Sequence, residues 1–165
     1  MAIFTKRVMC WDKKMEIYKL ALFGHRDLNS HIKVERGLHR LFNELIKTKA
    51  YIEIYIGRNG EFDVYTASVI RGLQKTFGYE RINMTLVLPY AVKDIEYYEK
   101  YYSSIIIPEC TYGVHHKRAI TERNRWMIRK CDMCVCFTER ESGGAYTAMQ
   151  YAKQKGKRVL NLAQE

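Results

Sequence analysis

Short apolar runs alternate along this chain with longer segments in which apolar residues recur at helical spacing. The runs at 18–23, 51–56, 84–88, 104–107, 133–137 and 158–162 are typical of strands, and the segments 32–49, 62–77, 94–102, 117–130 and 145–155 are typical of helices. Such alternation indicates βαβ units, whose strands pair in parallel. The runs are rich in Ile, Val and Leu, as expected when both faces of a sheet are covered. We therefore predict an α/β fold with a mainly parallel central sheet and helices on both faces.

The chain has 165 residues, which is the length of one domain, and 47% of them are hydrophobic. We predict a single domain over 1–165, with 1–17 as an N-terminal extension whose order the sequence does not decide. Cys10 and Trp11 suggest that this extension packs on the domain or on a partner. No apolar stretch approaches the roughly 18 residues of a membrane helix, and no signal peptide begins the chain. We expect a cytoplasmic protein with no membrane partner.

Cysteines 10, 110, 131, 134 and 136 are odd in number, which favours reduced thiols over a disulfide framework. Cys131, Cys134 and Cys136 form C-x2-C-x-C downstream of His115 and His116. A zinc site needs about four ligands in tetrahedral array, and these residues lack finger-like spacing. We predict buried thiols and no metal.

The formal net charge of +10 raises the question of nucleic-acid binding. The basic residues are spread along the chain, and the densest cluster lies at 115–130. That cluster suits either a phosphate-binding face or the solvated face of one helix. Charge alone does not choose between a nucleotide, a nucleic acid and solubility.

The turn Ser142-Gly143-Gly144 lies between the apolar run 133–137 and a helical segment that starts at about Ala145. Two glycines let backbone N–H groups come close to a phosphate. A helix N-terminus adds unpaired donors and a partial positive charge. This order of strand, glycine turn and helix predicts a site for a nucleotide or a nucleotide derivative.

Polar residues also follow the other predicted strands. Ligands of open α/β sheets bind outside the carboxyl ends of the strands. The residues that we expect to meet the ligand there are Gly24, His25, Arg26, Gly57, Arg58, Asn59 and Asp63, together with Arg123, Ser142, Gly143, Gly144 and Thr147. Agreement among several loops is stronger evidence than any single motif.

Each loop residue also has a structural interpretation. Gly24 and Gly57 can relieve tight strand-to-helix turns, and Asp63 can be a helix N-terminal charge or cap. His25 and Arg26 can pair with a neighbouring carboxylate or a helix end. An arginine at this edge nevertheless suits phosphate, because its guanidinium offers paired donors.

Five segments together resemble the SLOG superfamily, which includes the DprA/Smf and LOG ("Lonely guy") proteins. They are GHRDL at 24–28, GRNGEFD at 57–63, VLPY at 87–90, ERNRW at 122–126 and ESGGAYTAMQYA at 141–152. The similarity spans 18–163 and looks closest to the small YpsA-like SLOG proteins of Gram-positive bacteria. It implies a Rossmann-like three-layer sandwich that binds nucleotides or their derivatives, and it implies a homo-oligomer.

LOG enzymes remove the base from a nucleoside monophosphate, and part of their signature is present. Glu122, Arg123, Asp132, Gly143, Gly144 and Thr147 match it, while Ser142 stands for a proline and Tyr146 for a third glycine. Gln150 stands where the signature ends in glutamate. A carboxylate stabilises the positive charge that develops on ribose, and a neutral amide does not; losing such a group costs on the order of 10²–10⁴ in rate.

The resemblance therefore supports a prediction of phosphate binding more strongly than a prediction of catalysis. The leading hypothesis is a sensory or regulatory domain that holds a nucleotide-derived small molecule, with no further cofactor. The first alternative is a phosphoribohydrolase, with Glu122, Arg123 and the substitute carboxylate Glu141 as catalytic candidates. The second is DprA-like binding of nucleic acid.

Overall fold

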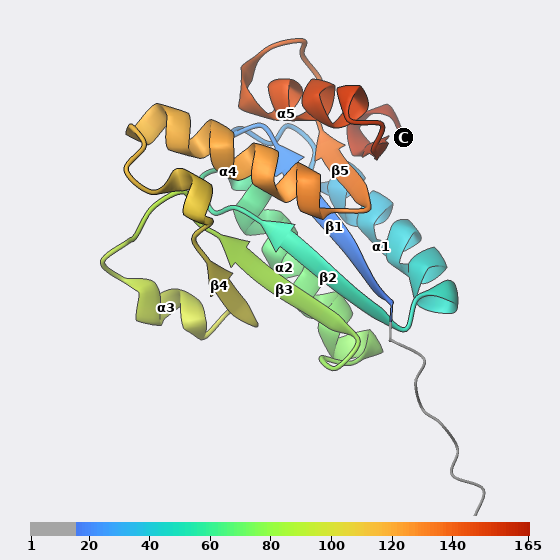
Figure 1. Cartoon of the computed structure of the whole chain (residues 1–165). Helices are drawn as coiled ribbons and strands as arrows, with labels where there is room; N and C mark the ends of the chain where they lie inside the picture. The colour runs from blue at the N-terminus through green and yellow to red at the C-terminus, as the bar shows by residue number, and fades with distance from the viewer. Residues whose placement is uncertain (1–15) are drawn as a thin grey trace, which may run out of the picture.

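The computed structural model of the chain describes residues 16–165 (Figure 1). Cys10, Trp11 and nearly all of the extension 1–17 lie outside these residues. The described part contains one sheet with the strand order β4-β3-β2-β1-β5-β6, and all neighbours pair in parallel. The strands are β1 (Ile17–Gly24), β2 (Tyr51–Ile56), β3 (Ile82–Val87), β4 (Ser104–Ile106), β5 (Met133–Phe137) and β6 (Arg158–Asn161).

Helices cover the sheet on opposite faces, with α1 and α2 on one and α4 and α5 on the other (Figure 1). The helices are α1 (His31–Thr48), α2 (Glu61–Phe77), α3 (Ile95–Glu99), α4 (His116–Lys130) and α5 (Gly143–Gln154). Two short 3₁₀ turns, Glu109–Thr111 and Leu162–Gln164, were not predicted. The predicted α/β fold, with a parallel sheet between two helical layers, is confirmed.

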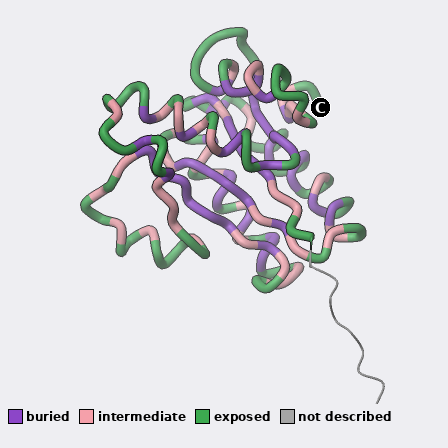
Figure 2. Tube along the Cα trace, viewed as in Figure 1, coloured by how far each residue is buried: buried purple, intermediate pink, exposed green. Residues whose placement is uncertain are grey.

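Alternate strand residues supply two separate cores. On β1, Leu20 and Leu22 pack with the α1 and α2 side chains, while Ala21 and Phe23 pack with those of α4 and α5. Successive strand residues point to opposite faces, so a strand buried on both sides reads as a continuous apolar run. Figure 2 shows this burial along the central strands.

The helix predicted at 94–102 shortens to α3, Ile95–Glu99, which has no buried residue. A helix this short needs an apolar face packed against a core, because its own hydrogen bonds barely offset the cost of ordering it. The remaining predicted elements are present, with ends shifted by one or two residues. None of the helices in 16–165 is long and apolar enough to span a membrane.

The chain adds β2, β3 and β4 on one side of β1 and then crosses to β5 on the other side. Adjacent connections diverge at such a switch point, which opens a crevice at the carboxyl ends of the two central strands. The fold thus places the loops after β1, β2 and β5 around one opening.

Candidate functional site

A cleft of about 430 Å³ lies at this switch point. Its lining includes most of the residues expected to meet a ligand: Gly24, His25, Arg26, Gly57, Asn59, Asp63, Arg123, Ser142, Gly143 and Gly144. These residues come from the loops after β1, β2 and β5 and from α2, α4 and α5. The volume suits a small organic ligand.

The N-terminus of α5 forms one wall of the cleft and has free donors. Ser142 precedes the helix in extended conformation, its side chain makes no capping hydrogen bond, and the first turn has no acidic residue. Gly143 has a φ of +87°, which is strained for any residue with a side chain. A Cβ on Gly144 would meet nothing within 4 Å. The helix start is therefore open to an anion.

His25 lies beside this helix start and is only 7% exposed. Its Nδ1 is 4.0 Å from the position that a Cβ of Gly143 would occupy. Burial, aided by nearby Arg140, lowers the pKa of His25 below its usual 6.5, and Glu139 and Asp27 oppose this. Its buried Nε2 has no hydrogen-bond partner among the described residues. Such a nitrogen is costly to leave unpaired, and a ligand in the cleft would satisfy it.

Arg123 reaches the cleft from α4 and is 6% exposed. Its Nη1 donates to the Val87 carbonyl at 2.9 Å, and its buried Nε has no partner in the described residues. Burial lowers the pKa of Arg123, while Asp63 and Tyr90 oppose that effect. Arginine stays protonated in proteins, so the group remains a cation in the cleft wall.

Asp63, in the first turn of α2, supplies the opposite charge. Its Oδ2 accepts a hydrogen bond from the Asn59 backbone N–H at 3.0 Å. Burial raises the pKa of Asp63 to about 6, although Arg123 and that N–H favour the charged form. A Cβ on Gly57 would lie 2.6 Å from Arg123 Nη1 and 2.7 Å from Asp63 Oδ2. A side chain at position 57 would therefore clash with both, and Gly57 lets Arg123 and Asp63 approach the loop after β2.

Gly24 and Gly60 serve packing between loops. A Cβ on Gly24 would overlap the Phe62 ring, with atoms 2.0–2.5 Å apart. A Cβ on Gly60 would lie 2.9 Å from the Arg26 Cα, and the Glu61 N–H donates to the Arg26 carbonyl at 2.8 Å. The loop after β1 thus lies directly on the start of α2.

Two residues expected to meet the ligand do not line this cleft. Arg58 turns towards α3, where its Nη1 donates to the Tyr98 hydroxyl at 2.7 Å. Thr147 donates to the Gly143 carbonyl at 3.0 Å and lies in a neighbouring hollow between α4 and α5.

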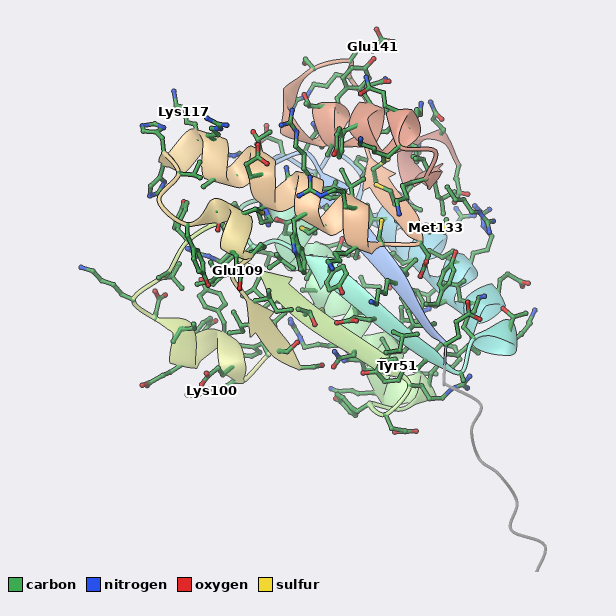
Figure 3. The ribbon with its side chains drawn as sticks, in the orientation of Figure 1. Tyr51, Lys100, Glu109, Lys117, Met133 and Glu141 are labelled. Atoms are coloured by element: carbon green, nitrogen blue, oxygen red, sulfur yellow. The ribbon has the colours of Figure 1, made fainter. Side chains whose placement is uncertain are left out.

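The expected catalytic carboxylates also lie outside the cleft lining. Glu122 pairs with Arg125 at 3.1 Å. Glu141 is exposed in the loop before α5, as Figure 3 shows. Gln150 lines the hollow between α4 and α5. The carboxylates that do line the cleft are Asp27 and Asp63.

Asp27, Arg140 and Asn124 line the cleft but were not expected there. Arg140 lies 3.6 Å from Asp27, and both are exposed at the rim. Their positions in the loops after β5 and β1 offered a signal, since neighbours in those loops were predicted. Asn124 follows Arg123 on α4. It lines the cleft only because of the way in which that helix packs on the sheet.

The cysteines on and before β5 are buried. Burial raises the pKa of Cys131 to about 11 and that of Cys136 to about 12, and it also raises the pKa of Cys134. Such thiols stay protonated and unreactive near neutral pH. No group of three His, Cys, Asp or Glu side chains within 16–165 is arranged to hold a metal ion.

Comparison with solved structures identifies the fold. The chain matches DNA processing protein A (DprA) from Streptococcus pneumoniae with a TM-score of 0.62 and 16% identity, over 87% of this chain and 49% of that one. The protein has a DprA-like fold. It also matches DprA from Helicobacter pylori, whose structure concerns the binding of single-stranded DNA, with a TM-score of 0.56 and 16% identity.

The second match covers 86% of this chain and 63% of the DprA chain, so the protein spans about half of one relative and less than two thirds of the other. No family model matches the sequence, and no curated protein matches it. The comparisons thus confirm a DprA-like fold, and the resemblance to the SLOG superfamily and to its YpsA-like proteins stays a prediction.

Proposed function

We propose that the protein binds a nucleotide or a nucleotide-derived small molecule in the switch-point cleft, in a sensory or regulatory role. The observation that carries this proposal is His25, whose Nδ1 lies near the open N-terminus of α5 and whose buried Nε2 has no partner among the described residues. A phosphate at that point would accept hydrogen bonds from the free backbone N–H groups and from His25. Ser142, Gly143 and Gly144 would form its cradle.

The opposite wall suits the uncharged part of such a ligand. Asp63 and Asn59 offer a carboxylate, which accepts hydrogen bonds from ribose hydroxyls, and an amide, which both donates and accepts them. The cations Arg26 and Arg140 lie at the exposed rim and Arg123 is buried in the wall, so each can offset phosphate charge. The cleft therefore has an anionic-ligand side and a polar, hydroxyl-binding side.

Two measurements test this proposal. Mass spectrometry of small molecules released from the purified protein would identify a bound ligand directly. Calorimetry against mono-, di- and cyclic nucleotides would then measure affinity, and His25→Ala should weaken it about tenfold by removing one hydrogen bond from a buried site. Folded protein that releases nothing and binds none of the panel would contradict the proposal.

Binding of single-stranded nucleic acid is a second candidate, supported by the net charge of +10 and by the likeness to a DprA that binds single-stranded DNA. It makes a distinct prediction, because each phosphate contact releases counterions. Affinity for an oligonucleotide should fall steeply as salt rises. Affinity that does not change with salt would rule this candidate out.

A further inference from the structure

A groove of about 270 Å³ lies between α4 and α5, directly beside the cleft. Ile120, Asn124 and Gly144 line both hollows, so the two are adjacent. Nothing lies within 4 Å of the position that a Cβ of Gly144 would occupy. Gly144 is exposed and has no side chain, so nothing at this position separates the anion-binding wall of the cleft from the groove.

The side chains that line the groove are of the kinds that bind a flat ring. Ile120, Ile128 and Ala148 provide apolar walls from the two facing helices. Thr147 and Gln150 add polar groups along the α5 side. Apolar walls with a few polar groups are typical of small-molecule sites, where the polar groups decide orientation and selectivity.

Asn124 stands at the junction of the two hollows. Its amide oxygen, Oδ1, is buried and accepts no hydrogen bond from any described residue. A buried acceptor without a donor costs free energy, and an N–H group on a ligand passing from the cleft into the groove would satisfy it.

We propose that the groove between α4 and α5 is the subsite for the ring of the ligand, and that Asn124 selects rings bearing an N–H donor. This inference rests on the proposed function, since the phosphate of the same ligand occupies the cleft. It narrows the ligand class to phosphate esters that carry a planar heterocycle with an amino or imino N–H group. Gln150 and Thr147 then contact the ring instead of the phosphate.

The test compares ligands that differ by one part at a time. Calorimetry on the full chain would measure inorganic phosphate, ribose 5-phosphate, adenosine 5′-monophosphate and purine riboside 5′-monophosphate, the last of which lacks the amino group. We expect adenosine monophosphate to bind at least about tenfold more tightly than ribose 5-phosphate, because the ring buries apolar surface. We expect purine riboside monophosphate to lose about tenfold to a hundredfold, since it leaves the Asn124 oxygen unpaired.

The outcomes separate this inference from the proposed function. Equal affinity for ribose 5-phosphate and adenosine monophosphate would show that the groove is not used, while the phosphate site would stand. If none of the four ligands binds, both this inference and the proposed function are contradicted. Equal affinity for the two purine nucleotides would overturn the role of Asn124.

A matched pair of variants gives an independent readout. Asn124→Leu should abolish the preference for adenosine monophosphate over purine riboside monophosphate. Asn83→Leu, on β3 and outside both hollows, should keep that preference. Thermal unfolding would verify that both variants fold, and an Asn124→Leu protein that keeps a tenfold preference would contradict the proposal.

Discussion

The N-termini of α2 and α5 meet at the same edge of the sheet, but only one of them is closed by the chain itself. Glu61 in α2 accepts the Leu28 backbone N–H at 3.0 Å and lies 3.0 Å from His31, while Asp63 accepts the Asn59 N–H. Neither helix has a side-chain capping hydrogen bond at its N-cap, but the first turn of α2 contains two acidic residues and that of α5 contains none. Helix N-termini attract negative charge. The N-terminus of α2 has acidic residues of its own, whereas that of α5 has none and is available to an anionic ligand.

The largest expected effect comes from giving α5 the carboxylate that α2 already has. Gly144→Asp should weaken the binding of adenosine monophosphate about a hundredfold, because like charges placed together in a site cost several kcal/mol. Calorimetry measures the loss. Gly144→Asn is the matched control for size, and it should retain more affinity than the aspartate variant. Equal losses in both variants would show that space, and not charge, is what matters there.

The two glycines of the α5 turn should respond in opposite directions to alanine. Gly143→Ala should lower the free energy of unfolding by about 1–2 kcal/mol, because its φ of +87° is unfavourable for an L-residue. Gly144→Ala should raise it by up to about 1 kcal/mol, since helices favour alanine and its Cβ meets open space. Chemical denaturation measures both. Similar effects at the two positions would contradict the assigned backbone geometry.

Removing one polar side chain from each helix start should also distinguish the two helices. Glu61→Ala should lower the free energy of unfolding by about 1 kcal/mol, because it leaves the Leu28 N–H without its acceptor. Ser142→Ala should change it by less than about 0.5 kcal/mol, since that side chain makes no capping bond. A Ser142 variant as unstable as the Glu61 variant would show that α5 is capped after all.

The smallest expected effect is on the pH dependence of phosphate binding, and it comes from Asp63 in the wall of the cleft. Asp63, with a pKa raised to about 6, is mostly ionised at pH 8 and mostly protonated at pH 5. Its negative charge repels an anion only at the higher pH. Asp63→Asn should therefore bind inorganic phosphate about threefold more tightly than the unaltered protein at pH 8.

At pH 5 the two proteins should bind phosphate equally. The ratio of the two affinities is also measured with sulfate, whose charge does not change over this range, because the repulsion between Asp63 and phosphate grows as phosphate gains its second negative charge. Phosphate titrations at several pH values measure that ratio. A ratio that stays constant across this range would show that Asp63 does not titrate there.

Much of the fold could be predicted because its signals are local. The strands are continuous apolar runs and the helices have clear periodicity, so their order, and hence the parallel sheet, follows from neighbours in the sequence. The segment 94–102 is the exception. Its tyrosines have helical spacing, but no residue of α3 is buried, and the helix ends at Glu99 instead of continuing to 102.

The candidate site was predicted only in part, for a related reason. Loops at strand ends could be assigned to one edge, so His25, Asp63 and the glycine turn were found. Side-chain direction within a loop depends on distant partners, and Arg58 turns to Tyr98 on α3. Asn124 lies inside a helix, where no loop signal marks it.

The sequence by itself determined the order of strands and helices along the chain, the parallel sheet that this order indicates and the glycine turn before α5, because these depend on backbone preferences and on periodic burial. The tertiary structure alone decided which groups are left without partners. His25 Nε2, Arg123 Nε and Asn124 Oδ1 are unpaired because elements far apart in the chain bury them around one cleft. Whether a donor or acceptor is satisfied depends on every neighbour in space, and those neighbours exist only once the chain has packed.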